Sequence, residues 1–344
     1  MGSATEMNQP IAARGGANVP FSVRDPAKDG AGHNAPFTKD APASGASIRV
    51  EFTRLENLGV AARAGASDVA AGDNVLRIVF GSGRGSVLHD ATMPPFLVAP
   101  LRGSLRVVDG HCTRLLRSRQ LFVGEHGGNL QIVGGMSALW IAVIASAPLW
   151  RRLFEATADA PMSEPVLLTA AHAADPAILR AMIRAVRAAA KPDTGRIETI
   201  NAAMGIAARL AELQASFDAR VDRCPGRTQS QRRAVFSRLQ RVHSWMEWGT
   251  DLSVELPTFA QAAGYSTCHF VRIFNAVYGE TPYAALVERR LDKAHRLIHS
   301  TELSITEIAR ASGFIDRCAF ARSFKRRFGK SATAMRNRRS ALVG

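Results

Sequence analysis

Two stretches near the C-terminal end of this 344-residue chain are near copies of one another, and this repeat constrains the fold more than any other feature. Ala260 and Gly264 of the first copy recur 49 positions later as Ala309 and Gly313. After one inserted residue, the offset becomes 50, and Phe270, Arg272, Phe274 and Gly279 match Phe320, Arg322, Phe324 and Gly329. Such a repeat indicates one structural unit that is used twice.

Each copy has the pattern of two short helices joined by a tight turn. The small side chains of Ala260 and Ala309 allow a second helix to cross closely, and a glycine in each copy permits a sharp turn. The two phenylalanines of each second helix are four residues apart, so they share one buried face. We therefore predict two helix-turn-helix units.

The residues around each turn support this prediction. Ser266 and Asp316 stand where the second helix of each copy should begin, and both residue types are good N-caps. Tyr265 and Phe314 are expected to fill the corner between the helices. Residues 282–300, between the copies, predict one helix of roughly 28 Å, at about 1.5 Å per residue. Successive major-groove turns of DNA are about 34 Å apart, which is a compatible spacing.

The charge of the chain is concentrated in the same region. The whole chain has a net charge of +15, and residues 231–344 hold 19 Lys and Arg against 9 Asp and Glu, or +10. A basic domain attracts phosphate backbones, although the same charge would also suit a merely soluble surface.

The upstream part of the chain has a different pattern. Residues 1–45 are rich in Gly, Ala and Pro without a hydrophobic period, so we predict a disordered leader. Residues 46–147 predict a β-sandwich or a small barrel, which can hold one ligand. The expected strands are Ile48–Thr53, Val75–Phe80, Phe96–Val98, Ser104–Val108, Leu115–Val123, Leu130–Val133 and Leu139–Ser146.

Residues 149–221 change to a helical pattern. Asp175 and Pro176 are typical of a helix start, and a second helix is expected over 195–221. Its predicted apolar stripe consists of Ile197, Ile200, Met204, Ala207, Leu210, Leu213 and Phe217. Together these segments predict a helical hairpin, which packs against its own domain or forms a homodimer. Residues 222–230 have the composition of a linker before a domain at 231–344.

Several kinds of site are not expected. The four cysteines are widely spaced and no His-x-His pair occurs, so we expect no disulfide scaffold, no metal and no other cofactor. The longest apolar stretch, 136–149, is shorter than the ~20 residues of a membrane-spanning helix. The chain begins without a signal-peptide pattern, and we expect a cytoplasmic protein.

Residues 231–340 closely resemble the AraC family of bacterial transcription regulators. The resemblance depends on the two copies, on residues 289–294 of the connecting segment, and on the runs 305–314 and 320–329. A weaker resemblance, carried by residues 100–110, covers about 48–220 and implies a cupin-like regulatory barrel with a helical hairpin. The implied fold class is α+β, with a regulatory domain at 46–221 and an all-α domain at 231–344.

The resemblance implies that the exposed face of each second helix reads DNA bases. The corresponding positions are Cys268, Val271 and Arg272 in the first copy, and Arg317, Cys318, Ala319 and Arg322 in the second. Arg272 and Arg322 are the best candidates for guanine, because a guanidinium can bond O6 and N7 together. The expected phosphate contacts are Lys325, Arg326 and Arg327, while His269 and Asn275 contact the DNA backbone or solvent.

The chain departs from the family at Ala332, where proline is usual, and at Met335, near which an aromatic residue is usual. The implied function is a transcription regulator, an activator by family tendency, that is not an enzyme. Its expected partners are double-stranded DNA, RNA polymerase, a second copy of the chain, and a small-molecule effector or another regulatory partner.

Three alternatives stay open at this point. Some DNA-repair alkyltransferases carry a similar helix-turn-helix module, but they need a four-cysteine zinc centre, and the cysteines here are not clustered. A sequence-neutral architectural DNA binder would have the same charge. Cys268 and Cys318 could also act as a redox switch.

Overall fold

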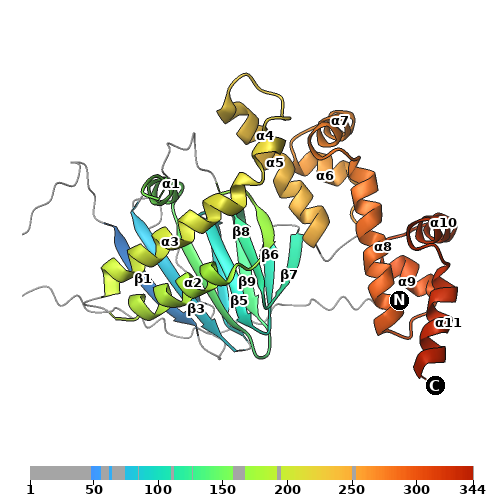
Figure 1. The fold of residues 1–344 in the computed structure, drawn as a ribbon, viewed down its shortest axis with the longest axis horizontal. Helices are drawn as coiled ribbons and strands as arrows, with labels where there is room; N and C mark the ends of the chain where they lie inside the picture. Colours follow the sequence, from blue (N-terminus) through green and yellow to red (C-terminus); the bar gives the residue numbers. More distant parts are fainter. Residues whose placement is uncertain are drawn as a thin grey trace, which may run out of the picture. The chain divides into compact units, whose positions relative to one another are not determined.

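The computed structural model has α+β architecture, in which a β-rich part precedes a helical part (Figure 1). The predicted fold class is therefore confirmed. The predicted leader, residues 1–45, lies outside the described residues. The structure describes residues 48–55, 62–63, 74–83, 85–109, 112–125, 127–157, 167–191, 195–249 and 253–343.

The β-rich part consists of two sheets. The first has the strand order β1-β3-β10-β5-β8-β11, and the second has the order β2-β4-β9-β6-β7. The strands are β1 Arg49–Leu55, β2 Ala62–Arg63, β3 Val75–Ser82, β4 Val87–Met93, β5 Phe96–Arg102, β6 Ser104–Asp109, β7 Cys112–Arg117, β8 Gln120–Gly124, β9 Gly127–Gly134, β10 Leu139–Ala145 and β11 Ala170–Ala173.

The first sheet is covered on both faces, and β10 shows why its sequence is almost continuously apolar. Trp140, Ala142 and Ile144 enter the core between the two sheets, where Phe96 and Phe122 also lie. The alternate residues of β10 enter a second core, which three helices complete: α1 Ala147–Glu155, α2 Pro176–Ala189 and α3 Gly195–Ala215. A strand with two buried faces needs apolar residues at successive positions.

Three features of this part differ from the prediction. The run 115–123 is two strands, because Arg119, at φ 68°, reverses the chain between β7 and β8. Strands β2 and β4 were not predicted. Strand β11 lies in the stretch that was expected to be helical, and it forms by antiparallel pairing with β8.

The helical hairpin is present over one face of the first sheet (Figure 1). Its helices are α2 Pro176–Ala189, which Asp175 caps as predicted, and α3 Gly195–Ala215; α1 Ala147–Glu155 precedes them and α4 Asp218–Val221 follows. The prediction was wrong in extending the second helix to residue 221. The predicted stripe was also wrong in part, because Ile197 is 72% exposed while Ala202, Ala203 and Ile206 are buried.

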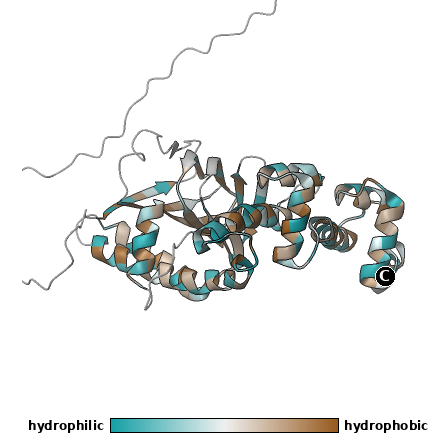
Figure 2. Ribbon diagram, turned by 90° about the horizontal axis from the view of Figure 1, so that it is seen from above, coloured by the Kyte–Doolittle hydropathy of each residue, from teal (hydrophilic) through white to brown (hydrophobic). Residues whose placement is uncertain are grey.

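The C-terminal part contains α5 and two helix-turn-helix units joined by α8 (Figure 1). Helix α8 spans the 19 residues predicted for the connecting helix. Hydrophilic and hydrophobic residues alternate along these helices (Figure 2), as expected for elements with one buried face. The bounds are α5 Gln229–Trp248, α6 Leu256–Ala262, α7 Thr267–Tyr278, α8 Pro282–Ser300, α9 Ile305–Ala311, α10 Arg317–Phe328 and α11 Ala332–Val343.

The two helix-turn-helix units pack into two different cores. The core of the first unit includes Phe236 of α5 and Phe270 and Phe274 of α7. The core of the second unit includes Phe320 and Phe324 of α10. Ala332, despite its departure from the family pattern, is buried in the second core, and Met335 packs against it.

Across the part of the chain that the structure describes, no helix combines the length and the apolar character that a bilayer crossing requires.

Gly81 offers a test of the packing between the sheets. A Cβ atom there would lie 2.0 Å from Cε2 of the fully buried Trp140, whose Nε1–H donates to Ser86 Oγ at 2.8 Å. We expect Gly81→Ala to lower the free energy of unfolding by about 1–3 kcal/mol, measured by urea denaturation, because the indole must shift.

Gly205, in the interior of α3, is the matched control. Apart from the backbone of its own helix, no atom lies within 4 Å of a Cβ built there. Gly205→Ala should therefore raise the stability by up to about 1 kcal/mol through helix propensity. Equal effects of the two substitutions would contradict the packing described for Trp140.

Candidate nucleic-acid interface

The two helix-turn-helix units have the same backbone geometry at the turn. In the first unit, Tyr265 N–H donates to the Ala260 carbonyl at 2.9 Å. In the second unit, Phe314 N–H donates to the Ala309 carbonyl at 3.0 Å. This bond from the third residue after a helix back into its last turn is typical of a Schellman motif. The repeat seen in the sequence is therefore a repeat in structure.

The glycine of each turn is required by its conformation. Gly264 has φ +74° and Gly313 has φ +86°, in the left-handed region where a Cβ atom is unfavourable. Both alanines that precede these turns are buried, with 1% of Ala260 and 3% of Ala309 exposed. This burial is what the predicted close crossing of the two helices requires.

Both second helices are capped as predicted. Ser266 Oγ accepts a hydrogen bond from His269 N–H at 3.4 Å. The Asp316 carboxylate accepts from Cys318 N–H at 2.8 Å and from Ala319 N–H at 3.1 Å. Each cap satisfies amides that lack a partner inside the helix, and so it fixes the residue at which the helix begins.

The buried face of each second helix decides which residues remain available to a ligand. Phe270 and Phe274 of α7 pack edge to face with ring centroids 5.5 Å apart. Phe320 and Phe324 of α10 pack at a similar distance, 5.4 Å, with tilted rings. All four rings are at most 1% exposed, and their burial turns the other side of each helix outward.

On α7 the predicted base-reading residues lie together. Cys268, Arg272 and Asn275 are exposed, and Val271 is half-buried beside them. Their spacing of three and four residues places them on one face. His269 is exposed on the flank of this face, where its ring lies 5.1 Å from that of Tyr265.

On α10 the predicted residues also share one side. Ala319 is half-buried, and the others are exposed: Arg317, Cys318, Arg322, Lys325 and Arg326. Four of the exposed residues are cationic, so this face of the second unit is the more basic of the two. The two exposed faces form the candidate interface.

Arg327 does not belong to this face. Its guanidinium forms ion pairs with Glu288 and with Asp292, the latter at 3.1 Å, both on α8. In the chain without DNA, two carboxylates of α8 therefore hold this cation, and its contact with phosphate stays a prediction. Glu288 and Asp292 are four residues apart on a predicted helix, and this spacing was the one signal in the sequence for these pairs.

His243 of α5 packs against the buried face of α7 in the first unit. Its ring stacks on Tyr278 with centroids 4.3 Å apart and packs against Phe274 at 5.8 Å. Burial, with a smaller effect of Arg220, lowers the pKa of His243 to about 4. Glu247, 3.7 Å away, would favour the charged form, but burial outweighs it because the neighbouring rings exclude water.

The four cysteines do not lie together. Cys112 and Cys224 are buried, and burial raises the pKa of each thiol to about 11. Cys268 and Cys318 are exposed on separate helices. Among the described residues, no group of three or more His, Cys, Asp or Glu side chains could hold a metal ion.

Comparison with known proteins finds matches to the region that contains this candidate interface. A helix-turn-helix domain model matches residues 259–338. Over 105 residues the chain is 33% identical to the virulence regulon transcriptional activator VirF of Yersinia enterocolitica, a match that covers 30% of this chain and 39% of VirF. Over 91 residues it is 35% identical to the HTH-type transcriptional regulator ExsA of Pseudomonas aeruginosa, covering 26% of this chain and 33% of ExsA.

A solved structure is similar to about a third of this chain. The DNA-binding domain of AdpA, a global transcriptional factor in complex with a target DNA, is 28% identical with a TM-score of 0.25. It covers 32% of this chain, and the chain covers 92% of that domain. The chain therefore spans 39% of the length of VirF and 33% of that of ExsA.

The buried His243 predicts a pH-dependent stability. Its pKa is about 4 in the folded chain, against the ordinary value of 6.5 that a histidine exposed by unfolding would have, so between these values the unfolded chain binds more protons. Stability should fall as the pH drops from about 6.5 towards 4, by up to about 3 kcal/mol. Thermal or urea unfolding over this pH range measures the loss.

Two variants separate His243 from other titrating groups. His243→Phe keeps an aromatic ring against Tyr278 and should remove most of this pH dependence. His299→Phe, at an exposed position of α8, should keep the wild-type profile. A His243→Phe variant with unchanged pH dependence would show that this ring is not held neutral by burial.

Proposed function

Because the C-terminal domain of this chain belongs to the AraC family of transcription regulators, we propose that the protein binds a specific DNA sequence and regulates transcription. The observation that supports this most directly is the pair of exposed, capped second helices, α7 and α10. Each is held by a buried phenylalanine pair, and each exposes the positions that the family uses to read bases.

The spacing of the two helices suits one duplex. Helix α8, 19 residues long, spans roughly 28 Å at about 1.5 Å per residue. Adjacent major-groove turns lie about 34 Å apart. We propose that α7 and α10 enter successive major grooves on one side of the DNA.

The proposed roles of the exposed residues follow from their chemistry. Arg272 and Arg322 read guanine through two hydrogen bonds, and each such contact contributes about 1–3 kcal/mol of discrimination. Val271 and Ala319 contact thymine methyl groups. Further base-facing positions are Cys268, Arg317 and Cys318.

The remaining residues bind the DNA backbone. Lys325 and Arg326 contact phosphates, and His269 and Asn275 contact the sugar-phosphate chain of the first half-site. Such contacts set the affinity and its dependence on salt, but they carry no base information.

The upstream part is proposed to regulate this activity. We assign regulation to residues 46–221, a linker to 222–230 and DNA binding to 231–344. The protein acts in the cytoplasm as a homodimer, activates transcription through RNA polymerase and catalyses no reaction. A small-molecule effector or another partner controls it through different affinities for its DNA-competent and DNA-incompetent states.

Selection of bound sequences from a random DNA library tests the central claim. A specific regulator should prefer its selected site over random DNA by about 10³-fold or more. A preference below about tenfold would instead indicate a sequence-neutral architectural binder.

Two substitutions on α10 test the proposed division of roles. Arg322→Ala should relax specificity at one base pair and cost about 1–3 kcal/mol on the selected site. Lys325→Ala should weaken binding to all sequences evenly, and it should reduce the slope of log K against log salt by about 1. Fluorescence anisotropy with selected and single-substitution sites measures both effects. Equal losses on selected and random DNA for Arg322→Ala would contradict its base-reading role.

A further inference from the structure

The two units dock their second helices with different chemistry. The offset of 50 aligns Ile273 with Ser323, and Val277 with Arg327. In the first unit, Ile273 and Val277 are buried, at 7% and 0% exposed. In the second unit, a half-buried serine and a partly exposed arginine occupy the same places. Helix α10 therefore lacks two of the four apolar anchors of α7.

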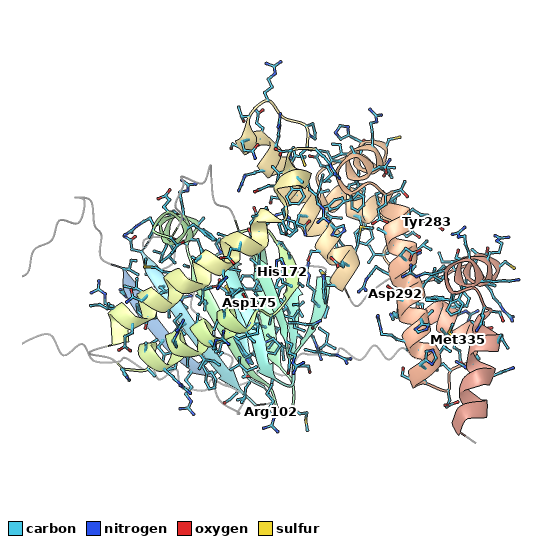
Figure 3. All side chains as sticks on the ribbon, in the orientation of Figure 1. Arg102, His172, Asp175, Tyr283, Asp292 and Met335 are labelled. Atoms are coloured by element: carbon cyan, nitrogen blue, oxygen red, sulfur yellow. The ribbon has the colours of Figure 1, made fainter. Side chains whose placement is uncertain are left out.

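Arg327 replaces these anchors with a charged contact to α8. Its Nη1 pairs with Glu288 Oε2, and its Nη2–H donates to Asp292 Oδ1 at 3.1 Å. The guanidinium also lies 5.6 Å from the ring centre of Phe328. We call Arg327, Glu288 and Asp292 the α8–α10 clamp. Figure 3 shows Asp292 near the middle of α8, the helix that both units share.

We propose that Arg327 is a positioning residue that fixes the rotation of α10 on α8, and so the direction in which Arg322 points. This inference rests on the proposed function and deepens it. Its basis is the clamp together with the absence of the two apolar anchors.

The helical geometry makes this role effective. Arg322 and Arg327 are five residues apart, which places them about 140° apart around the helix at about 100° per residue. The clamp therefore holds the side of α10 that lies away from the base-reading face. A two-bond contact between Arg322 and guanine tolerates little rotation, since productive geometry requires placement within roughly 10–20°.

The clamp also removes one cation from the DNA-binding surface. The three side chains are 37%, 43% and 36% exposed, so water and salt screen each pair. Two carboxylates on one guanidinium nevertheless give a directional contact that a phosphate would have to break. Arg327 thus serves specificity at the second half-site, whereas its neighbour Arg326 serves affinity.

The acidic partners Glu288 and Asp292 give the sharpest test. A positioning role of Arg327 and a phosphate-binding role of Arg327 predict opposite effects on DNA binding when these two acids are removed. If the clamp positions α10, Glu288→Gln with Asp292→Asn should lower the discrimination between the selected site and a site altered in its second half. The expected loss is roughly three- to tenfold, and Arg327→Ala should cause a similar loss. If Arg327 instead contacts phosphate, removing these two acids should leave DNA binding unchanged or strengthen it.

Two matched controls accompany these variants. Glu280→Gln removes one exposed acid between α7 and α8 and should not reduce discrimination. Arg326→Ala removes the neighbouring exposed arginine and should weaken all sequences evenly. The charge-swapped chain, with Arg327→Asp, Glu288→Lys and Asp292→Lys, should regain at least half of the lost discrimination.

Amide hydrogen exchange on the full chain without DNA provides a second readout. Arg327→Ala and the double acid variant should speed exchange in residues 317–328 and leave residues 267–278 as in the wild type. Unchanged exchange in 317–328, or full discrimination in the double acid variant, would overturn the proposal. If the wild-type chain selects no DNA site, the proposed function fails, and the exchange measurement still decides whether the clamp holds α10.

Discussion

The burial of one phenylalanine pair in each second helix is the contact on which the interface depends. Phe270 with Phe274, and Phe320 with Phe324, are four residues apart, so removing both rings from water fixes which side of each helix faces inward. Burying each ring is worth about 1.5–3 kcal/mol, more than the exposed ion pairs nearby contribute. The outward side then follows from helical geometry alone, and it is the side that holds the arginines.

Beyond the shared phenylalanines, the two units differ in how firmly they are held. The first adds Ile273, Val277 and the stacked His243 and Tyr278, all of which depend on apolar burial and are insensitive to salt. The second also has a stacked pair, His295 with Phe328, but in place of the two aliphatic anchors it has ion pairs at half-exposed positions, whose strength falls as salt rises. The repeated sequence therefore produces two units with the same backbone turn and different resistance to reorientation.

The sequence predicted the C-terminal part closely because its signals are local. Caps, turn glycines and phenylalanine spacing act within a few residues, and α8 spans the predicted residues 282–300. The β-rich part was harder, because β11 is an alanine-rich segment that becomes a strand only by pairing with β8. Ile197 misled the stripe prediction, since α3 packs through small alanines that allow a close approach to the sheet. Contacts between helices, such as the clamp, depend on how far one helix is shifted and rotated against the other. The spacing of residues along each helix does not determine this.

The packing between the sheets restricts how a signal could reach the DNA-binding part. Trp140, Phe96 and Phe122 fill the space that a ligand would occupy in a hollow barrel. Gly81 and Gly124 leave no room for even one more carbon beside these rings, since a Cβ at Gly124 would lie 2.2 Å from Phe96. A ligand entering this core would have to displace buried aromatic rings, at a cost of about 3–5 kcal/mol for each ring lost. If residues 46–221 regulate DNA binding as proposed, an outer surface of this part would receive the signal at lower cost, since binding there requires no such displacement.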